Sequence, residues 1–297
     1  MQNTKLAYKY ALAAVFFWST VASAFKLTLE YLSPTQLVFY SSISSTICIY
    51  FLLLYLKKTN LIKEYIKNNF FKVLLLGFLN PFLYYLILFK AYSILPAQEA
   101  QAINYTWALM LALLSVPILK QKLRFQDILA GLICYFGVLI IATKGDLFEL
   151  NFSNLEGVFY ALLSTIIWAL YWLFNIKNTS EPIVALFSNF LISLSFISLY
   201  YFLQGDISIP SLYGILGSIY IGFFEMGITF VLWITAISYA KNISSISNLI
   251  FISPFFSLIF IYFFVGEQIL LSTIVGLILI IFGLLFQKYY KSTSVKY

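Results

Sequence analysis

The sequence predicts an all-α polytopic membrane protein with ten transmembrane helices arranged as a 5+5 inverted repeat. Three observations predict this fold class: the composition, ten apolar runs of membrane-spanning length, and matching residues in the two halves. Hydrophobic residues make up 62% of the chain and charged residues 10%, whereas soluble domains contain roughly 45 to 50% apolar and about 25% charged residues. The mean hydropathy is +0.93. A water-soluble globule is therefore excluded.

Each apolar run is close to the roughly 20 residues that an α-helix needs to cross about 30 Å of hydrocarbon. Helices are expected because the runs are apolar on every side, whereas barrel strands alternate in polarity. Four prolines, at positions where a missing N–H matters least, lie at or near predicted helix starts: Pro34, Pro96, Pro182 and Pro210. The predicted spans are 7–29, 34–56, 70–92, 97–119, 125–143, 155–175, 182–203, 212–235, 243–264 and 270–289.

The Lys and Arg residues predict the orientation of the bundle. With the N-terminus in the cytoplasm, 15 of the 18 Lys and Arg residues fall on the cytoplasmic side, and Lys26, Lys90 and Lys144 fall on the other. This positive-inside bias predicts a multi-pass protein of a cell (inner) membrane with both termini cytoplasmic. The lipid bilayer explains the net charge of +7, so no nucleic-acid partner is expected.

The two halves of the chain share weakly matching residues at a nearly constant offset. These matches predict a first five-helix repeat at residues 1–148 and a second at residues 149–297. Because five is an odd number, the copies must face opposite ways across the membrane, an architecture in which secondary transporters place a substrate site near the midplane. The matched pairs are Trp18 with Trp168, Ala91 with Ala236, Ser93 with Ser238, Gly131 with Gly276, and Gly137 with Gly283.

The scarcity of metal-ligating residues argues against several chemistries. The chain contains no His, and Cys48 and Cys134 stand singly within apolar runs. We therefore expect no metal, no cofactor and no His-based catalysis, and we interpret both thiols as small packing residues.

Glu225 is the ionisable residue that lies most clearly near the middle of a predicted span. Placing such a group in a bilayer costs roughly 2.5 to 3.5 kcal/mol on insertion scales, which makes it a functional candidate. Thr229 and Trp233 follow at i+4 and i+8, so we expect the three residues to share one helix face. The carboxyl group could exchange a proton during transport or hold a substrate ammonium group. The alternative is a neutral carboxyl group that only bonds a neighbouring helix.

Asn80 lies 145 residues before Glu225 and precedes Pro81, with Tyr84 on its face at i+4. Proline in a spanning helix is tolerated where protein or water satisfies the freed backbone groups. Pro254, in the span that carries Asn248, has the same interpretation. The alternative is that both prolines only shape helix packing.

Polar and aromatic side chains in other spans are further candidates for a cavity lining. The span 97–119 carries Gln101, Asn104 and Tyr105 on one face, and the span 243–264 carries Ser244, Ser247 and Asn248. Such stripes face protein or water, so the alternative is simple interhelical hydrogen bonding. Mid-span tryptophans suggest a stacking surface, although aromatic residues are abundant throughout the chain. These tryptophans are Trp18, Trp107, Trp168 and Trp172.

Three charged residues lie at the outer ends of predicted spans: Lys26, Lys90 and Glu99. We interpret them as snorkelling side chains or a surface ion pair. The alternative is an electrostatic mouth for an anionic or zwitterionic substrate.

Three segments carry a family resemblance: FWSTVASAFK at 17–26, LPAQEAQAINYTW at 95–107 and VGEQ at 265–268. Together with the 5+5 repeat, they resemble the EamA-type permeases of the drug/metabolite transporter superfamily over essentially the whole chain. The resemblance implies a proton-linked or gradient-driven carrier, often an exporter, of amino acids or other small metabolites.

The residues and the resemblance together predict a secondary-active carrier that works by alternating access around a central cavity. Glu225 would be its charged centre, and a zwitterionic or aromatic amino acid fits such a site. The alternatives are a membrane channel, which normally shows charged rings or a filter loop, and a membrane-embedded enzyme, which needs paired catalytic groups. The sequence leaves the oligomeric state open and is compatible with a monomer.

Overall fold

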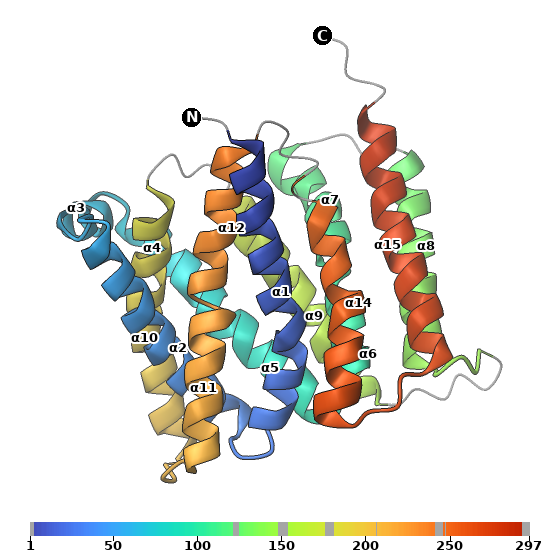
Figure 1. Cartoon of the computed structure of the whole chain (residues 1–297), viewed down its shortest axis with the longest axis horizontal. Coiled ribbons are helices and arrows are strands. Elements are labelled where there is room, and N and C mark those ends of the chain that lie inside the picture. Colours follow the sequence, from blue (N-terminus) through green and yellow to red (C-terminus); the bar gives the residue numbers. More distant parts are fainter. Residues whose placement is uncertain are drawn as a thin grey trace. The chain divides into compact units, whose positions relative to one another are not determined.

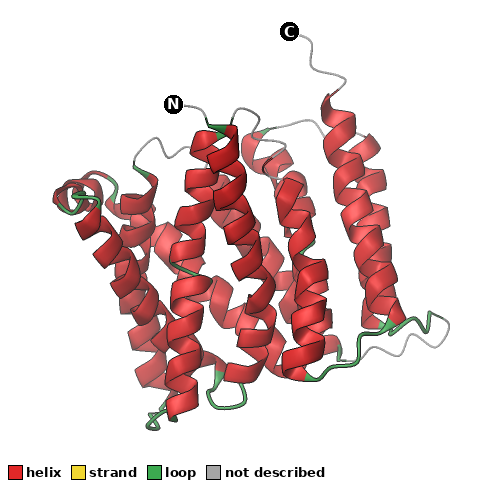
Figure 2. Cartoon of the chain, in the orientation of Figure 1, coloured by secondary structure: helices red, strands yellow, loops and turns green. Residues whose placement is uncertain are grey.

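The computed structural model describes residues 3–120, 125–147, 154–175, 181–205, 207–240, 246 and 248–292. Within these ranges every regular element is helical (Figure 2). With interrupted helices counted as single segments, seven are long and apolar enough to cross a membrane. Shorter apolar helices cover Ile128–Ala142, Leu249–Val265 and Leu271–Gln287. The all-helical class is confirmed, and the count of ten spanning helices stays a prediction.

The elements follow one another along the chain as Figure 1 labels them. The first half contains α1 (Thr4–Thr28), α2 (Pro34–Tyr55), α3 (Asn60–Asn68), α4 (Phe70–Gly77), the wide turn η1 (Phe78–Leu83), α5 (Tyr84–Ile94), α6 (Ala97–Asn104), α7 (Trp107–Leu119) and α8 (Phe125–Ala142). The second half contains α9 (Leu155–Asn175), α10 (Pro182–Gln204), α11 (Leu212–Phe224), α12 (Ile228–Tyr239), η2 (Asn248–Ile252), α14 (Ser253–Phe260), η3 (Ile261–Val265) and α15 (Leu271–Ser292).

The prolines mark helix starts as the sequence predicts. Pro34 is the first residue of α2, whose N-terminus carries a reciprocal cap: Ser33 Oγ accepts from Gln36 N at 3.3 Å, and Gln36 Oε1 accepts from Ser33 N at 3.0 Å. Pro182 likewise begins α10, where Glu181 Oε2 accepts from Val184 N at 2.8 Å. These side chains satisfy N–H groups that the first helical turn leaves without a partner.

Two predicted spans are interrupted at positions 145 residues apart. In the span 70–92, Asn80 has an extended backbone (φ −145°, ψ 122°) between α4 and α5, and Pro81 follows it through a cis peptide bond. In the span 212–235, α11 ends at Phe224 and α12 begins at Ile228, so that Glu225 lies in the interruption. The sequence prediction of continuous helices is wrong here. A proline without an N–H accounts for the first interruption, and Gly227, at φ −108° and ψ −92°, accommodates the second.

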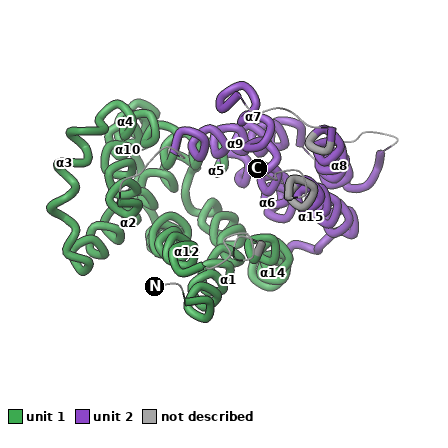
Figure 3. The backbone as a smooth tube through the Cα atoms, turned by 90° about the horizontal axis from the view of Figure 1, so that it is seen from above, with its two compact units in different colours: residues 1–89, 177–266 green, residues 90–176, 267–297 purple. Residues whose placement is uncertain are grey.

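The chain forms two compact units, which Figure 3 colours separately. Unit 1 comprises Met1–Phe89 and Lys177–Gly266, and unit 2 comprises Lys90–Ile176 and Glu267–Tyr297. Each unit combines helices from both halves of the chain. The units therefore differ from the repeats predicted at 1–148 and 149–297, which stay a prediction.

Side-chain contacts fix the directions of the helices inside unit 1. Ring contacts between Tyr40 and Tyr201 and between Tyr50 and Phe187 make α2 and α10 antiparallel. Two further sets of contacts make α11 parallel to α2 and α4 parallel to α10: Gly214 with Leu32, Gly222 with Ser41, Gly77 with Asn189, and Phe82 with Tyr200. Consequently α4 and α11 run in opposite directions.

In unit 2, glycines allow α8 and α15 to pack closely. A Cβ on Gly137 or Gly276 would lie 2.6 Å from the carbonyl oxygen of the other residue, and a Cβ on Gly283 would lie 2.6 Å from Cys134 Sγ. These contacts make the two helices antiparallel. Small residues at such interfaces let helix backbones approach closely in lipid, where no hydrophobic force drives association.

We expect Gly276→Ala to destabilise the protein by about 1 to 3 kcal/mol, because the new methyl group would overlap a backbone oxygen that cannot move alone. Thermal unfolding in detergent measures this loss. The matched control is Gly131→Ala, because a Cβ there meets its nearest neighbour, Leu109, at an ordinary 3.9 Å. Equal melting temperatures for the two variants would contradict the close packing of α8 and α15.

Two of the segments that carry the family resemblance contact each other within unit 2. The carboxylate of Glu267 caps α6: Oε1 accepts from Ala97 N at 2.7 Å and Oε2 from Gln98 N at 3.2 Å. The amide of Gln98 in turn accepts from Leu270 N at 3.1 Å and from Thr273 Oγ1 at 2.8 Å. A negative charge at a helix N-terminus is favourable, so these residues join α6 to the start of α15.

Replacing Glu267 by Gln removes the charge from this cap while keeping one acceptor oxygen. We expect Glu267→Gln to lower the free energy of unfolding by about 1 to 2 kcal/mol. Denaturant titration of the purified protein in detergent measures the change. Glu64→Gln, at an exposed position on α3, serves as the control; a loss of the same size in both variants would refute the capping role.

Candidate functional site

Glu225 lies in the interruption between α11 and α12, and its side chain is held by one phenol. Its backbone N–H donates to Ile221 O at 2.9 Å and closes the last turn of α11. Oε1 accepts a hydrogen bond from the hydroxyl group of Tyr85 at 3.0 Å. Oε2 is buried and has no hydrogen-bond partner among the described residues. A buried carboxyl oxygen in this state is costly unless a proton, a water molecule or a ligand satisfies it.

Asn80 contributes a second unsatisfied polar group to unit 1. Its side chain is fully buried, and neither the amide oxygen nor the amide nitrogen has a partner in the described part of the chain. Each unsatisfied buried donor or acceptor costs about 1 to 3 kcal/mol. Such groups are rare in native structures, so the amide is a natural candidate for contact with a bound molecule.

Tyr85, which the sequence interpretation missed, takes the place expected of Tyr84. Spacing of i+4 from Asn80 selected Tyr84, on the assumption of an unbroken helix. The extended backbone at Asn80 shifts the phase of α5, so that Tyr85 bonds Glu225, while Tyr84 is buried beside it with ring centroids 4.8 Å apart. Pro81 was the signal that could have shown this shift.

Trp18 of α1 forms an aromatic wall beside the carboxyl group. Its indole faces Glu225 and packs against Phe230 at 5.9 Å and Trp233 at 5.3 Å between ring centroids. The edge-on and tilted geometries are those that aromatic pairs prefer. The structure thus brings together Glu225 and Trp18 from the predicted set, and Trp233 from the same helix-face argument.

Thr229 has a different place from the one expected. Its side chain is fully buried, and its hydroxyl group donates to the carbonyl oxygen of Phe224, across the interruption. Because α11 ends before Glu225, the prediction that Glu225, Thr229 and Trp233 share one continuous helix face is wrong. Thr229 satisfies a backbone carbonyl that the broken helix would otherwise leave without a partner.

Small hydroxyl side chains add to the polarity inside unit 1. Ser23 on α1 and Ser253 and Ser257 on α14 are buried, and their Oγ atoms have no partner within the described ranges. The helices α1 and α14 pack against each other. Spacing of i+4 between Ser253 and Ser257, directly beside Pro254, was the sequence signal for this pair.

The remaining predicted residues lie in unit 2, apart from Asn248. Asn104 Nδ2 donates to Ser164 Oγ at 2.9 Å, and Gln101 is buried near it in sequence on α6. Tyr105 and Trp107 flank the boundary between α6 and α7. The backbone of Asn248 begins η2 in unit 1, whereas its side chain, together with Ser244 and Ser247, lies outside what the structure describes.

Trp168 and Trp172 belong to an aromatic group on α9. Trp168 stacks on Tyr171 at 5.5 Å and meets Trp172 edge-on at 5.9 Å. The indole nitrogen of Trp172 is buried without a hydrogen-bond partner in the described residues. An indole N–H normally finds an acceptor when buried, so Trp172 is also available to a bound molecule.

Glu99 corrects one expectation. Its side chain is fully buried in the first turn of α6, so the prediction of a surface residue at a span end is wrong for it. The described residues contain no group of three His, Cys, Asp or Glu side chains placed to hold a metal ion.

Helical segments of membrane-spanning length and unsatisfied polar groups at their interruptions define a multi-pass membrane protein of the transporter class. The chain belongs to the EamA-like transporter family, whose model matches residues 5–143 and 155–287. It is accordingly a membrane transporter of the drug/metabolite transporter superfamily, with a small-molecule substrate and the lipid bilayer as its surroundings.

Solved structures support the fold. Nineteen chains match, and one of them, described as "Crystal structure of protein", has a TM-score of 0.67 and 19% identity, covering 99% of this chain and 100% of its own. This likeness shows the fold alone. No curated protein matches the chain.

A double-mutant cycle between Tyr85→Phe and Glu225→Ala tests the hydrogen bond at the centre of the site. We expect Tyr85→Phe to destabilise the protein by about 1 kcal/mol in the wild-type background, because it removes the donor to Oε1, and by clearly less in Glu225→Ala. Thermal unfolding in detergent supplies both values. Tyr262→Phe, at a residue that is 54% exposed, is the control. Additive effects of the two substitutions would show that the side chains are not coupled.

Proposed function

We propose that the protein is a secondary-active carrier that exports a small amphiphilic metabolite, such as an amino acid, by alternating access. The observation that carries the proposal is the pair of interrupted helices at Asn80 and Glu225, with unsatisfied side-chain atoms at both. Carriers bind substrates where spanning helices are discontinuous, because the exposed backbone and polar groups are tolerated beside a cavity.

The chemistry of the site suits a group that carries a proton or a positive charge. Glu225 Oε2 offers a free acceptor, and Tyr85 holds the other carboxyl oxygen in place. Trp18 provides an aromatic face for an apolar or cationic part of the substrate, and Asn80 offers both a donor and an acceptor. Exchange between a proton and a substrate ammonium group at one carboxylate would couple transport to a proton gradient.

An inverted repeat would supply two related conformations for this cycle. The opposite directions of α4 and α11, and of α8 and α15, support such a repeat, as do interruptions that recur at an offset of 145 residues. In this proposal residues 1–148 and 149–297 are antiparallel copies, both termini are cytoplasmic, and the copies exchange conformations when access alternates.

Counterflow in proteoliposomes tests the proposal. Liposomes are loaded with a mixture of the twenty unlabelled amino acids, and each radiolabelled amino acid is supplied outside in trace amounts. We expect at least one label to accumulate transiently, because a carrier exchanges it for internal substrate. A channel would only equilibrate the label, and absence of any overshoot would contradict a carrier of amino acids.

The variant Glu225→Gln tests the role of the carboxyl group with the amino acid that shows counterflow. We expect the initial rate to fall at least about tenfold and to lose its dependence on pH, because the amide cannot exchange a proton. Glu64→Gln on the exposed face of α3 should behave as wild type. A Glu225→Gln protein with the wild-type rate and pH profile would remove the carboxyl group from the mechanism.

A further inference from the structure

The short helix α3 occupies what the sequence predicted as a loop between two spans. Leu61, Ile62, Tyr65 and Ile66 lie on one face, and the opposite face carries Lys63, Glu64 and Lys67. α3 packs against α4 and α10, and the ring of Tyr65 is buried. A helix with an apolar face and a Lys-bearing polar face lies in the headgroup region of a bilayer.

The end of α2 concentrates positive charge at the same place. Lys57 takes a left-handed conformation (φ 56°), while Lys58 N donates to Leu53 O at 2.9 Å, a helix-ending motif that turns the chain toward α3. Lys58 forms an ion pair with Glu181 at 2.8 Å. Within the described part of the chain, no ion pair is found for Lys57, Lys63 or Lys67.

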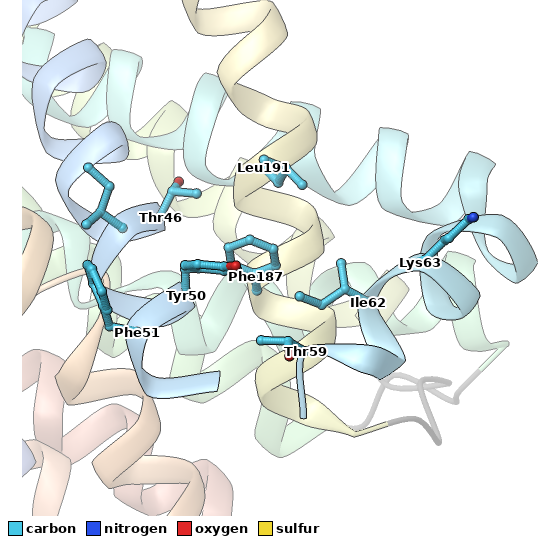
Figure 4. A pocket seen from close by; sticks show the side chains of 9 residues that line it. Thr46, Tyr50, Phe51, Thr59, Ile62, Lys63, Phe187 and Leu191 are labelled. Carbon is cyan, nitrogen blue, oxygen red and sulfur yellow. The ribbon is translucent and has the colours of Figure 1, made fainter. Parts of the chain in front are cut away.

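An apolar groove of about 790 Å³ lies between α2, α3 and α10 (Figure 4). The rings of Tyr50 and Phe187 pack at 5.7 Å along its wall, and Figure 4 shows Ile62 near them and Lys63 at the edge of the group. Towards the membrane-facing surface, Ile47 and Phe51 are 48% and 64% exposed. The groove therefore combines an apolar wall with an ammonium group at one end. All of its lining residues belong to unit 1: Thr46, Ile47, Tyr50, Phe51, Thr59, Ile62, Lys63, Phe187 and Leu191.

We infer that this groove binds an anionic phospholipid, with one acyl chain along α2 and α10 and the phosphate group beside Lys63. Charge complementarity selects this occupant, because three lysines without ion pairs surround the end of an otherwise apolar groove. The same lysines attract an anionic leaflet surface. A bound lipid would also brace α10, which packs against η1 and so supports the interrupted segment at Asn80.

Lipid retention measures this binding directly. The full chain, purified in detergent, is incubated with phosphatidylglycerol or with phosphatidylcholine of identical acyl chains, and bound lipids are counted by native mass spectrometry. We expect phosphatidylglycerol to be retained in preference, and Lys63→Gln to weaken its binding about fivefold, the usual effect of one lysine near an anionic surface. Lys9→Gln, an exposed lysine on α1, controls for overall charge and should retain the lipid.

A second pair of variants locates the acyl chain. Ile47→Trp places a large ring in the groove, whereas Leu54→Trp adds the same ring at a residue of α2 that is 44% exposed and does not line the groove. We expect the first variant to lose phosphatidylglycerol and the second to keep it. Equal retention of the two lipids by the wild type, or equal retention by the two Trp variants, would overturn the inference. So would a dimer that the Ile47→Trp substitution converts to a monomer, because a second copy would then be the occupant.

Discussion

The need to satisfy every backbone polar group in hydrocarbon governs this molecule. A break in a spanning helix frees N–H and C=O groups that no lipid can bond, at several kcal/mol each. The chain nevertheless breaks at Asn80 and at Glu225, and Thr229 returns a hydroxyl group to a freed carbonyl at the second break. Side chains that remain unsatisfied there have no structural reason to be polar. Their persistence is what makes a bound proton, water molecule or substrate the natural completion of the site.

The same constraint explains how the helices are joined. Where backbones must approach closely, glycines remove the Cβ, as at Gly137 and Gly276 between α8 and α15. Where a helix start must be buried, a charged side chain caps it, as Glu267 does for α6. These devices leave the interrupted segments of unit 1 as the places where polar groups remain available, while the lysines of α3 stay at the bilayer surface.

Local patterns predicted much of this fold, because they reflect the length of a span and the chemistry of helix ends. Apolar runs gave the helical segments, and prolines such as Pro34 and Pro182 gave their starts. Periodicity failed where a helix changes phase: Tyr84 was selected, whereas Tyr85 holds Glu225. Contacts between residues far apart in the chain, such as Gln98 with Thr273, were beyond reach, because spacing within one helix carries no information about a second helix.

Whether the interrupted segments meet water is the most direct test of this account. In a chain whose native thiols are removed by Cys48→Ser and Cys134→Ala, cysteine is introduced at position 80 or at position 225, and a water-soluble, charged maleimide is added to membranes opened on both sides. The account predicts alkylation at both positions at rates well above that of a cysteine at the lipid-exposed position 132, where Leu132 is 64% exposed. Protection of both positions from the charged reagent would contradict it, because the polar groups would then be sealed within protein or lipid.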